Sequence, residues 1–99
     1  MNDLEICKRI AEIEGVAFFH NKDHDTLWVR KLGIYSGNEY NPLTDDALCF
    51  GFIVKDKIEV EFDSDLNFVC AIDNVWVNNE NLNRAICMVK IKTHEAKNG

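Results

Sequence analysis

Two histidines in this chain have the spacing of a metal-ligand pair. His20 and His24 are four positions apart, with Asp23 and Asp25 beside them. On a helix this H-x3-H spacing would place both imidazoles on one face, where they could hold an ion such as zinc. The surrounding residues are polar turn formers, which predicts a hairpin loop over 21–25 instead. Because no third soft ligand is nearby, we expect a solvated turn and no bound metal.

A second candidate for chemistry is a row of carboxylates in the second half of the chain. The row consists of Glu59, Glu61, Asp63 and Asp65. Side chains two apart in a strand share one face, at a spacing of roughly 6–7 Å. Such a row can imitate the phosphates of a nucleic acid, so we predict a protein interface here. A solvated strand face and a weak cation site are the alternatives.

The adjacent Asp45 and Asp46 could be taken for a catalytic carboxylate pair. Neighbours on a helix point about 100° apart, so the two would not converge on one substrate atom. Negative charge also favours the first turn of a helix, with Thr44 as the expected N-cap. The only serines, Ser36 and Ser64, lie in no nucleophile or phosphate-binding motif. The sequence therefore predicts a protein that is not an enzyme and carries no cofactor.

Aromatic and basic residues supply an alternative, ligand-binding site. Aromatic rings can stack on a nucleotide base, and arginines can bind its phosphates. Most buried aromatic residues serve only as core, which is the competing interpretation. The candidate ligand-binding residues are Trp28, Arg30, Tyr35, Tyr40 and Arg84.

Length and composition limit what class of protein this is. Ninety-nine residues fit a single domain, expected over 1–99 with an ordered core at about 3–95. The net charge of -6 argues against general nucleic-acid binding. No apolar run is long enough to span a membrane, and the start of the chain lacks a basic signal region. We therefore expect a cytoplasmic protein, whose cysteines (Cys7, Cys49, Cys70 and Cys87) are small buried hydrophobic residues.

Periodicity and turn signals predict an α+β fold. The expected helices cover 2–14, 44–55 and 81–95. The expected strands cover 16–20, 26–31, 58–62 and 68–73, and an extension of the last strand is expected over 75–77, after a break at Asn74. Residues 33–40 are rich in turn formers and predict a loop. The order α-β-β-α-β-β-α indicates a four-stranded, mainly antiparallel sheet with three helices, resembling a sandwich.

The predicted central helix is apolar on almost every side. Its residues from Ala47 to Val54 are apolar apart from Gly51, so we expect it to be covered twice, once by its own sheet and once by something else. Gly51 in its middle predicts the close approach of another backbone. If the second face is not covered within the chain, Phe50 and Val54 become candidates for a homodimer interface.

Two motifs carry a resemblance to a known family. They are the run Tyr40-Asn-Pro-Leu-Thr-Asp-Asp-Ala-Leu48, which opens the central helix, and Asn83-Arg84-Ala85-Ile86-Cys87 in the closing helix. With the order of elements over residues 3–95, they resemble small bacteriophage proteins of the alpha-beta-alpha sandwich type, mostly of unknown function. The resemblance implies a phage product acting in the cytoplasm of an infected bacterium, and it supplies no catalytic residues.

Three functions are compatible with these features. The first is a non-catalytic protein that inhibits or modulates a host protein, such as a bacterial defence protein, by stoichiometric contact. The second is a protein that sequesters a nucleotide messenger of bacterial immunity, which would need to gather Arg30, Lys31, Arg84 or Lys90 around an aromatic pocket. The third is a structural accessory protein with no role against the host.

Overall fold

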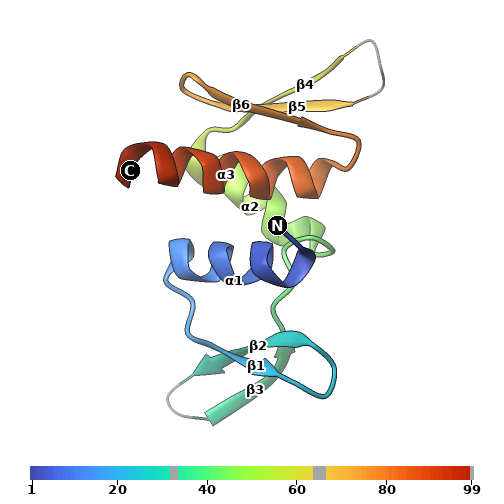
Figure 1. Ribbon diagram of the computed structural model, residues 1–99, viewed down its shortest axis with the longest axis vertical. Coiled ribbons are helices and arrows are strands. Elements are labelled where there is room, and N and C mark those ends of the chain that lie inside the picture. The colour runs from blue at the N-terminus through green and yellow to red at the C-terminus, as the bar shows by residue number, and fades with distance from the viewer. Residues whose placement is uncertain (32–33, 64–66, 99) are drawn as a thin grey trace. The chain divides into compact units, whose positions relative to one another are not determined.

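The computed structural model describes residues 1–31, 34–63 and 67–98, and the side chains of 30–38 lie outside this description. The chain forms two compact units, Met1–Asn41 and Pro42–Gly99. Each is described by itself below and can be followed in Figure 1. The expectation of one domain over 1–99 stays a prediction.

The first unit begins with helix α1 (Asp3–Glu14). The Asn2 side chain caps it by accepting a hydrogen bond of 2.8 Å from the backbone N–H of Glu5. Gly15 ends it in the left-handed conformation (φ 68°), which glycine adopts without steric cost. The helix that the sequence predicts over 2–14 is therefore confirmed.

An antiparallel sheet completes the first unit. Its strands are β1 (Phe18–Asn21), β2 (Thr26–Lys31) and β3 (Ile34–Glu39), in the order β1-β2-β3. The hairpin of β1 and β2 confirms the prediction, but the loop expected over 33–40 is wrong because β3 pairs with β2. Pairing with a neighbouring strand has overridden the low strand propensity of the glycine, serine and asparagine in this segment.

The second unit begins with helix α2 (Asp46–Asp56). Its N-cap is Asp45, whose carboxylate accepts a hydrogen bond of 3.1 Å from the backbone N–H of Leu48. The prediction of Thr44 as the cap is therefore wrong by one residue, because Asp45 holds the extended conformation that the cap position requires. Lys57, in the left-handed conformation, ends the helix.

The second sheet is an antiparallel meander. Its strands are β4 (Glu59–Phe62), β5 (Phe68–Ile72) and β6 (Val75–Asn79), in the order β4-β5-β6. The turn into β6 places Asp73 at φ 53°. The sequence predicts 75–77 as an extension of the preceding strand, but this turn folds it back as a strand of its own.

The α+β class and the three helices are confirmed, whereas the single four-stranded sheet is wrong. Each predicted hairpin gains its own third strand, so two separate antiparallel sheets form. In the second sheet the physical reason is local: the turn at Asp73 lets the next extended segment pair with the strand just completed. The order α-β-β-α-β-β-α is corrected to α-β-β-β-α-β-β-β-α.

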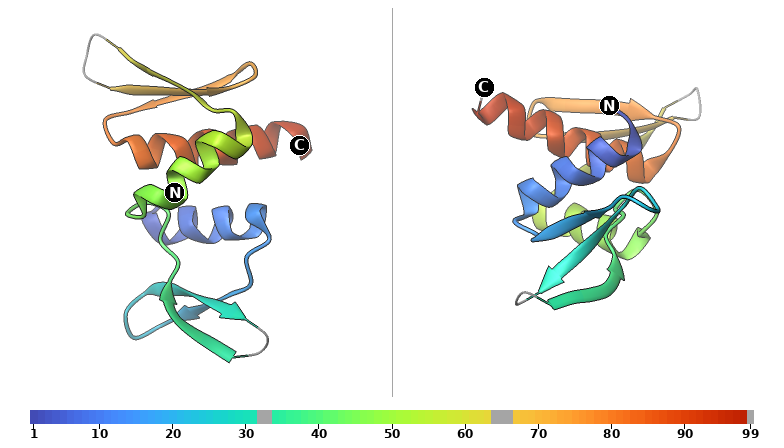
Figure 2. Two further views of the ribbon diagram at one scale, coloured as in Figure 1. Left: turned by 180° about the vertical axis from the view of Figure 1, so that it is seen from behind. Right: turned by 60° about the horizontal axis from the view of Figure 1, so that its bottom comes forward.

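Helix α3 (Leu82–Asn98) forms the centre of the second unit. It packs on β5 and β6 and also contacts α2, which crosses it in Figure 2. Its fully buried positions include Ala85, Ile86 and Val89, and Cys70 of β5 is also completely buried. The helix predicted over 81–95 is therefore confirmed, and these positions form its buried side.

A buried ion pair joins the two helices of this unit. Lys90 of α3 binds the carboxylate of Asp56 at the end of α2. The ammonium also lies 4.4 Å from the centre of the Phe52 ring. The Lys90 side chain is only 3% exposed and that of Asp56 is 26% exposed. The lysine therefore depends on its partner more than the carboxylate does.

We expect unequal effects from removing the two charges. Asp56→Asn leaves a buried ammonium without its counter-charge and should lower the free energy of unfolding by about 3 kcal/mol. Lys90→Met replaces the ammonium with an apolar chain of similar shape and should cost less than about 1 kcal/mol. Urea unfolding measures both, with Lys97→Met at the exposed end of α3 as the control. A larger loss from Lys90→Met than from Asp56→Asn would contradict this account.

Candidate functional site

The predicted acidic row is centred on β4. All four residues of this strand are exposed. Glu59 lies opposite Ala71 and Glu61 opposite Val69, so both carboxylates are on the same face of the sheet. Within the described part of the chain, neither glutamate takes part in an ion pair. Two solvated negative charges are thus held about 7 Å apart on a regular strand.

The rest of the predicted row behaves differently. Asp63 follows β4, is half-buried and accepts a hydrogen bond of 3.1 Å from the backbone N–H of Asn67. This hydrogen bond engages one carboxylate oxygen of Asp63, and the place of Asp63 in the acidic row stays a prediction. Asp65 lies outside the described residues.

The opposite face of β4 carries exposed apolar side chains. Val60 is 39% exposed and Phe62 is 63% exposed. The Phe62 ring meets that of Phe68 edge to face, with centroids 4.6 Å apart. Helix α3 covers β5 and β6, so these side chains stay open. The strand is therefore exposed on both faces.

Helix α2 also presents an open apolar face. Phe50 is 66% and Val54 64% exposed, and Ala47 and Gly51 are exposed on the same side of the helix. No atom lies within 4 Å of where a Cβ on Gly51 would be, so the predicted close approach of another backbone is wrong. Within this chain only Cys49 and Phe52 of the helix are buried, so the expected second cover is not supplied by the described residues and stays a prediction for a partner.

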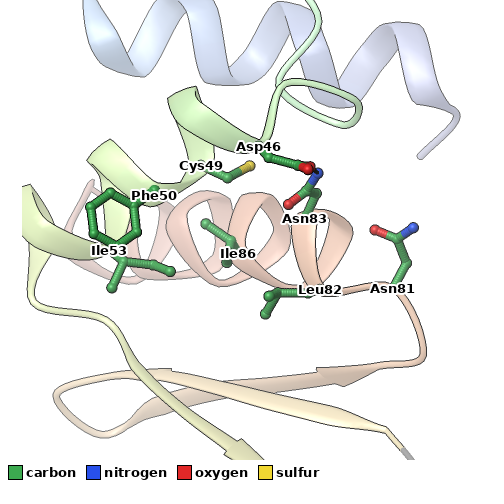
Figure 3. A pocket seen from close by; sticks show the side chains of 8 residues that line it. All are labelled: Asp46, Cys49, Phe50, Ile53, Asn81, Leu82, Asn83 and Ile86. Atoms are coloured by element: carbon green, nitrogen blue, oxygen red, sulfur yellow. Dashed lines mark hydrogen bonds between the residues drawn. The ribbon is translucent and has the colours of Figure 1, made fainter.

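A groove of about 410 Å³ runs between α2 and α3 (Figure 3). Its lining residues are Asp46, Cys49, Phe50, Ile53, Asn81, Leu82, Asn83 and Ile86. At one end, the side-chain amide of Asn83 donates to the Asp46 carboxylate at 2.8 Å and to the Leu43 carbonyl at 3.3 Å. This pair of bonds ties the start of α3 to the start of α2. Sequence patterns did not single out the groove, because the apolar spacing of each helix does not tell which residues of the other helix it meets.

Buried thiols lie under this groove. The Cys49 thiol donates to the Pro42 carbonyl at 3.0 Å. A hydrogen bond with Cys87, aided by the charge of Lys90, lowers the pKa of Cys49 against the opposing effects of burial and of Asp45 and Asp46. Burial, together with the nearby Cys49, raises the pKa of Cys70 to about 11. All four cysteines are buried free thiols, as the sequence predicts.

The structure describes the surroundings of only part of the alternative ligand site, which stays a prediction. Trp28 is half-buried and donates its indole N–H to Thr26 at 3.0 Å, and Tyr40 is 7% exposed. The side chains of Arg30 and Tyr35 lie outside the described residues, and Arg84 belongs to the other unit. A hollow of only about 60 Å³ beside Tyr40 is lined in part by three carboxylates, those of Asp3, Asp25 and Glu39.

The histidine pair lies at the hairpin that joins β1 and β2. His20 Nε2 is 2.7 Å from the carboxylate of Asp25, across the turn. His24 is exposed within the same turn. The described residues contain no group of three histidine, cysteine, aspartate or glutamate side chains arranged to hold a metal ion.

Comparison with protein-family models, with characterised proteins and with solved structures finds no match for this chain. In the part of the chain that the structure describes, no helix is both long enough and apolar enough to cross a membrane. The candidate site therefore rests on the geometry of the second unit alone.

The raised pKa of Cys70 predicts a loss of stability in alkaline solution. At a pH below the ordinary pKa of 9.0, the Cys70 thiol is protonated in both the folded and the unfolded protein, so its burial carries no electrostatic cost. Between pH 9 and 11 the unfolded chain releases this proton and the folded protein does not, so stability falls by about 2 kcal/mol. Urea unfolding of Cys70→Ala should show a shallower decline over this range than the parent protein. The control Val89→Ala loses packing but no thiol, so its free energy of unfolding should fall with pH as steeply as that of the parent protein. An equally steep fall in all three proteins would contradict the assignment to Cys70.

Proposed function

We propose that this chain is a non-catalytic binding protein, encoded by a bacteriophage, that modulates a protein of the bacterial host by stoichiometric contact. The observation that supports this most is β4, where exposed glutamates and exposed apolar side chains occupy opposite faces of one strand. Protein interfaces combine an apolar part that is removed from water with charges that select the partner. The phage origin rests on the two sequence motifs and their resemblance to small phage proteins.

The exposed apolar residues support the binding role in a second way. Phe50, Val54 and Phe62 are each more than 60% exposed. Scattered exposed apolar residues are normal, but large side chains gathered on one helix face and one strand are typical of surfaces that contact other proteins. Glu59 and Glu61, on the same strand as Phe62 but on its other face, favour a basic partner.

Sequestering a nucleotide messenger is the alternative function, and the geometry favours it less. Pockets for small molecules usually have volumes of about 300–1,000 Å³. The hollow beside Tyr40 is well below that range, and its carboxylates would repel phosphates. The groove between α2 and α3 is large enough, but Asp46 lies at its rim. A structural accessory protein with no role against the host remains the third alternative.

Charge reversal on β4 tests the binding role. Protein carrying both Glu59→Lys and Glu61→Lys should recover at least about tenfold less of its partner from a bacterial lysate, because two attractive charges become repulsive. Mass spectrometry of the captured material measures this. The matched control carries Glu80→Lys and Glu95→Lys, two exposed residues of the same unit, and should capture as much as the parent.

Three outcomes of this capture experiment would count against the proposal. If both double variants capture equally little of the partner, the net charge of the protein and not the position of the glutamates on β4 governs binding. Recovery of a bound nucleotide without a protein would favour messenger sequestration. Recovery of neither would favour the accessory protein.

Self-association through α2 is a separate expectation. The exposed stripe of Phe50 and Val54 should make the protein a homodimer, because pairing two copies removes both stripes from water. Sedimentation at tens of micromolar should show the dimer, and Phe50→Glu with Val54→Glu should shift it to monomer. A control variant with Glu12→Gln and Lys97→Gln, two exposed residues away from this stripe, should remain a dimer. A parent protein that sediments as a strict monomer rules out the dimer.

A further inference from the structure

The backbone of β4 forms a free edge of its sheet. In the order β4-β5-β6, this strand has a partner on one side only. The backbone N–H of Asp63 donates to the Asn67 carbonyl at 3.0 Å, which fixes the hydrogen-bonding pattern of the hairpin. Because paired residues alternate in an antiparallel ladder, Glu59 and Glu61 direct their backbone groups toward β5. Val60 and Phe62 therefore direct theirs to the open edge.

This edge lacks several of the usual features that prevent strand addition. The pairing of β4 with β5 runs through four consecutive residue pairs with no bulge. The strand Glu-Val-Glu-Phe contains no proline and no lysine. Its protection comes from its short length and its two glutamates, and these charges repel acidic strands but not basic ones. All four residues of β4 are exposed, so no described element covers the strand.

The side chains of β4 specify the chemistry of a strand that would pair with it. Residues directly opposite one another in an antiparallel pair share a face. A partner strand would thus place two side chains beside Glu59 and Glu61, and basic residues fit there. On the other face it would place two side chains beside Val60 and Phe62, and apolar residues fit there. The complementary sequence alternates lysine or arginine with apolar residues.

A second copy of the same strand is a poor partner. An antiparallel pair of two β4 strands that keeps the apolar residues together places Glu59 opposite Glu61, and Glu61 opposite Glu59. Like charges directly opposite each other destabilise a strand pair. The glutamates thus disfavour self-pairing while they attract a basic chain.

We infer that β4 binds an extended, basic segment of its partner protein as an added antiparallel strand. This inference rests on the proposed binding function and names the chemical class of the partner segment. The backbone groups of Val60 and Phe62 supply the hydrogen bonds, and Glu59 and Glu61 select lysine or arginine at alternate positions.

A synthetic peptide tests this with the complete protein. The probe is an eight-residue peptide of alternating lysine and valine, with both ends blocked. On binding, the backbone amides of Val60 and Phe62 should become protected from hydrogen exchange by at least about tenfold, because they gain hydrogen bonds. The amide of Glu61, which already faces β5, should change little. Protection at α2 in place of β4, or no binding at all, overturns the inference.

Methylated peptides separate strand addition from simple charge attraction. Methyl groups on the valine amides remove the donors that face β4 in the antiparallel arrangement, so affinity should fall by at least about tenfold. Methyl groups on the lysine amides point away from β4 and should leave affinity within about threefold. Equal binding of both peptides would show that charge alone attracts the probe, which overturns strand addition.

Protein variants provide the complementary measurement. Glu59→Gln with Glu61→Gln should weaken binding of the unmethylated probe by about tenfold, and Val60→Pro should do the same by removing an edge amide. Glu80→Gln with Glu95→Gln is the matched control. If Val60→Pro leaves capture of the lysate partner unchanged while the β4 charge reversal abolishes it, the edge inference fails and the proposed function stands. If the probe binds β4 but the lysate yields no partner, the proposed function fails and the edge remains.

Discussion

The burial of α3 is the constraint on which the second unit depends. One helix contacts β5 and β6 and also contacts α2, so it must be apolar over a wide arc. The buried lysine of this helix binds the carboxylate of Asp56 of α2, and the Phe52 ring lies next to its ammonium. This ion pair ties the end of α2 to α3. The amide of Asn83 fixes the other end by bonding Asp46.

The same constraint leaves parts of the unit uncovered. A single helix is about 10 Å wide, which is roughly the width of two strands of a sheet. Since α3 covers β5 and β6, the third strand lies beyond its reach, and the apolar side chains of Val60 and Phe62 are exposed. Similarly, α2 can bury only the side that faces α3, so the apolar residues on its other side remain open. The surfaces available for binding another protein are thus the direct result of packing a short sheet and two helices in one small unit.

Local signals were sufficient for much of the fold. Asn2 and Gly15 mark the ends of α1, and the polar run over 21–25 marks the first hairpin, because capping and turn chemistry act within a few residues. The buried stripe of α3 follows from its spacing for the same reason. The third strand of each sheet was predicted less well. Residues 34–39 have weak strand propensity, and only their pairing with β2 makes them a strand, which is information that the segment itself does not hold.

The sequence by itself determined the helices, the hairpins, the buried state of the cysteines and the same-face alignment of Glu59 and Glu61, because each follows from a period of 2 or 3.6 residues or from a local turn. Tertiary structure alone decided that the Asp63 carboxylate accepts a hydrogen bond from the backbone of Asn67, and that Phe50 and Val54 are exposed. Periodicity shows that residues share a face, but it cannot show whether another element covers that face. Exposure depends on how many strands a helix is wide enough to cover. In this protein α3 covers β5, which forms part of the core, and leaves β4 exposed.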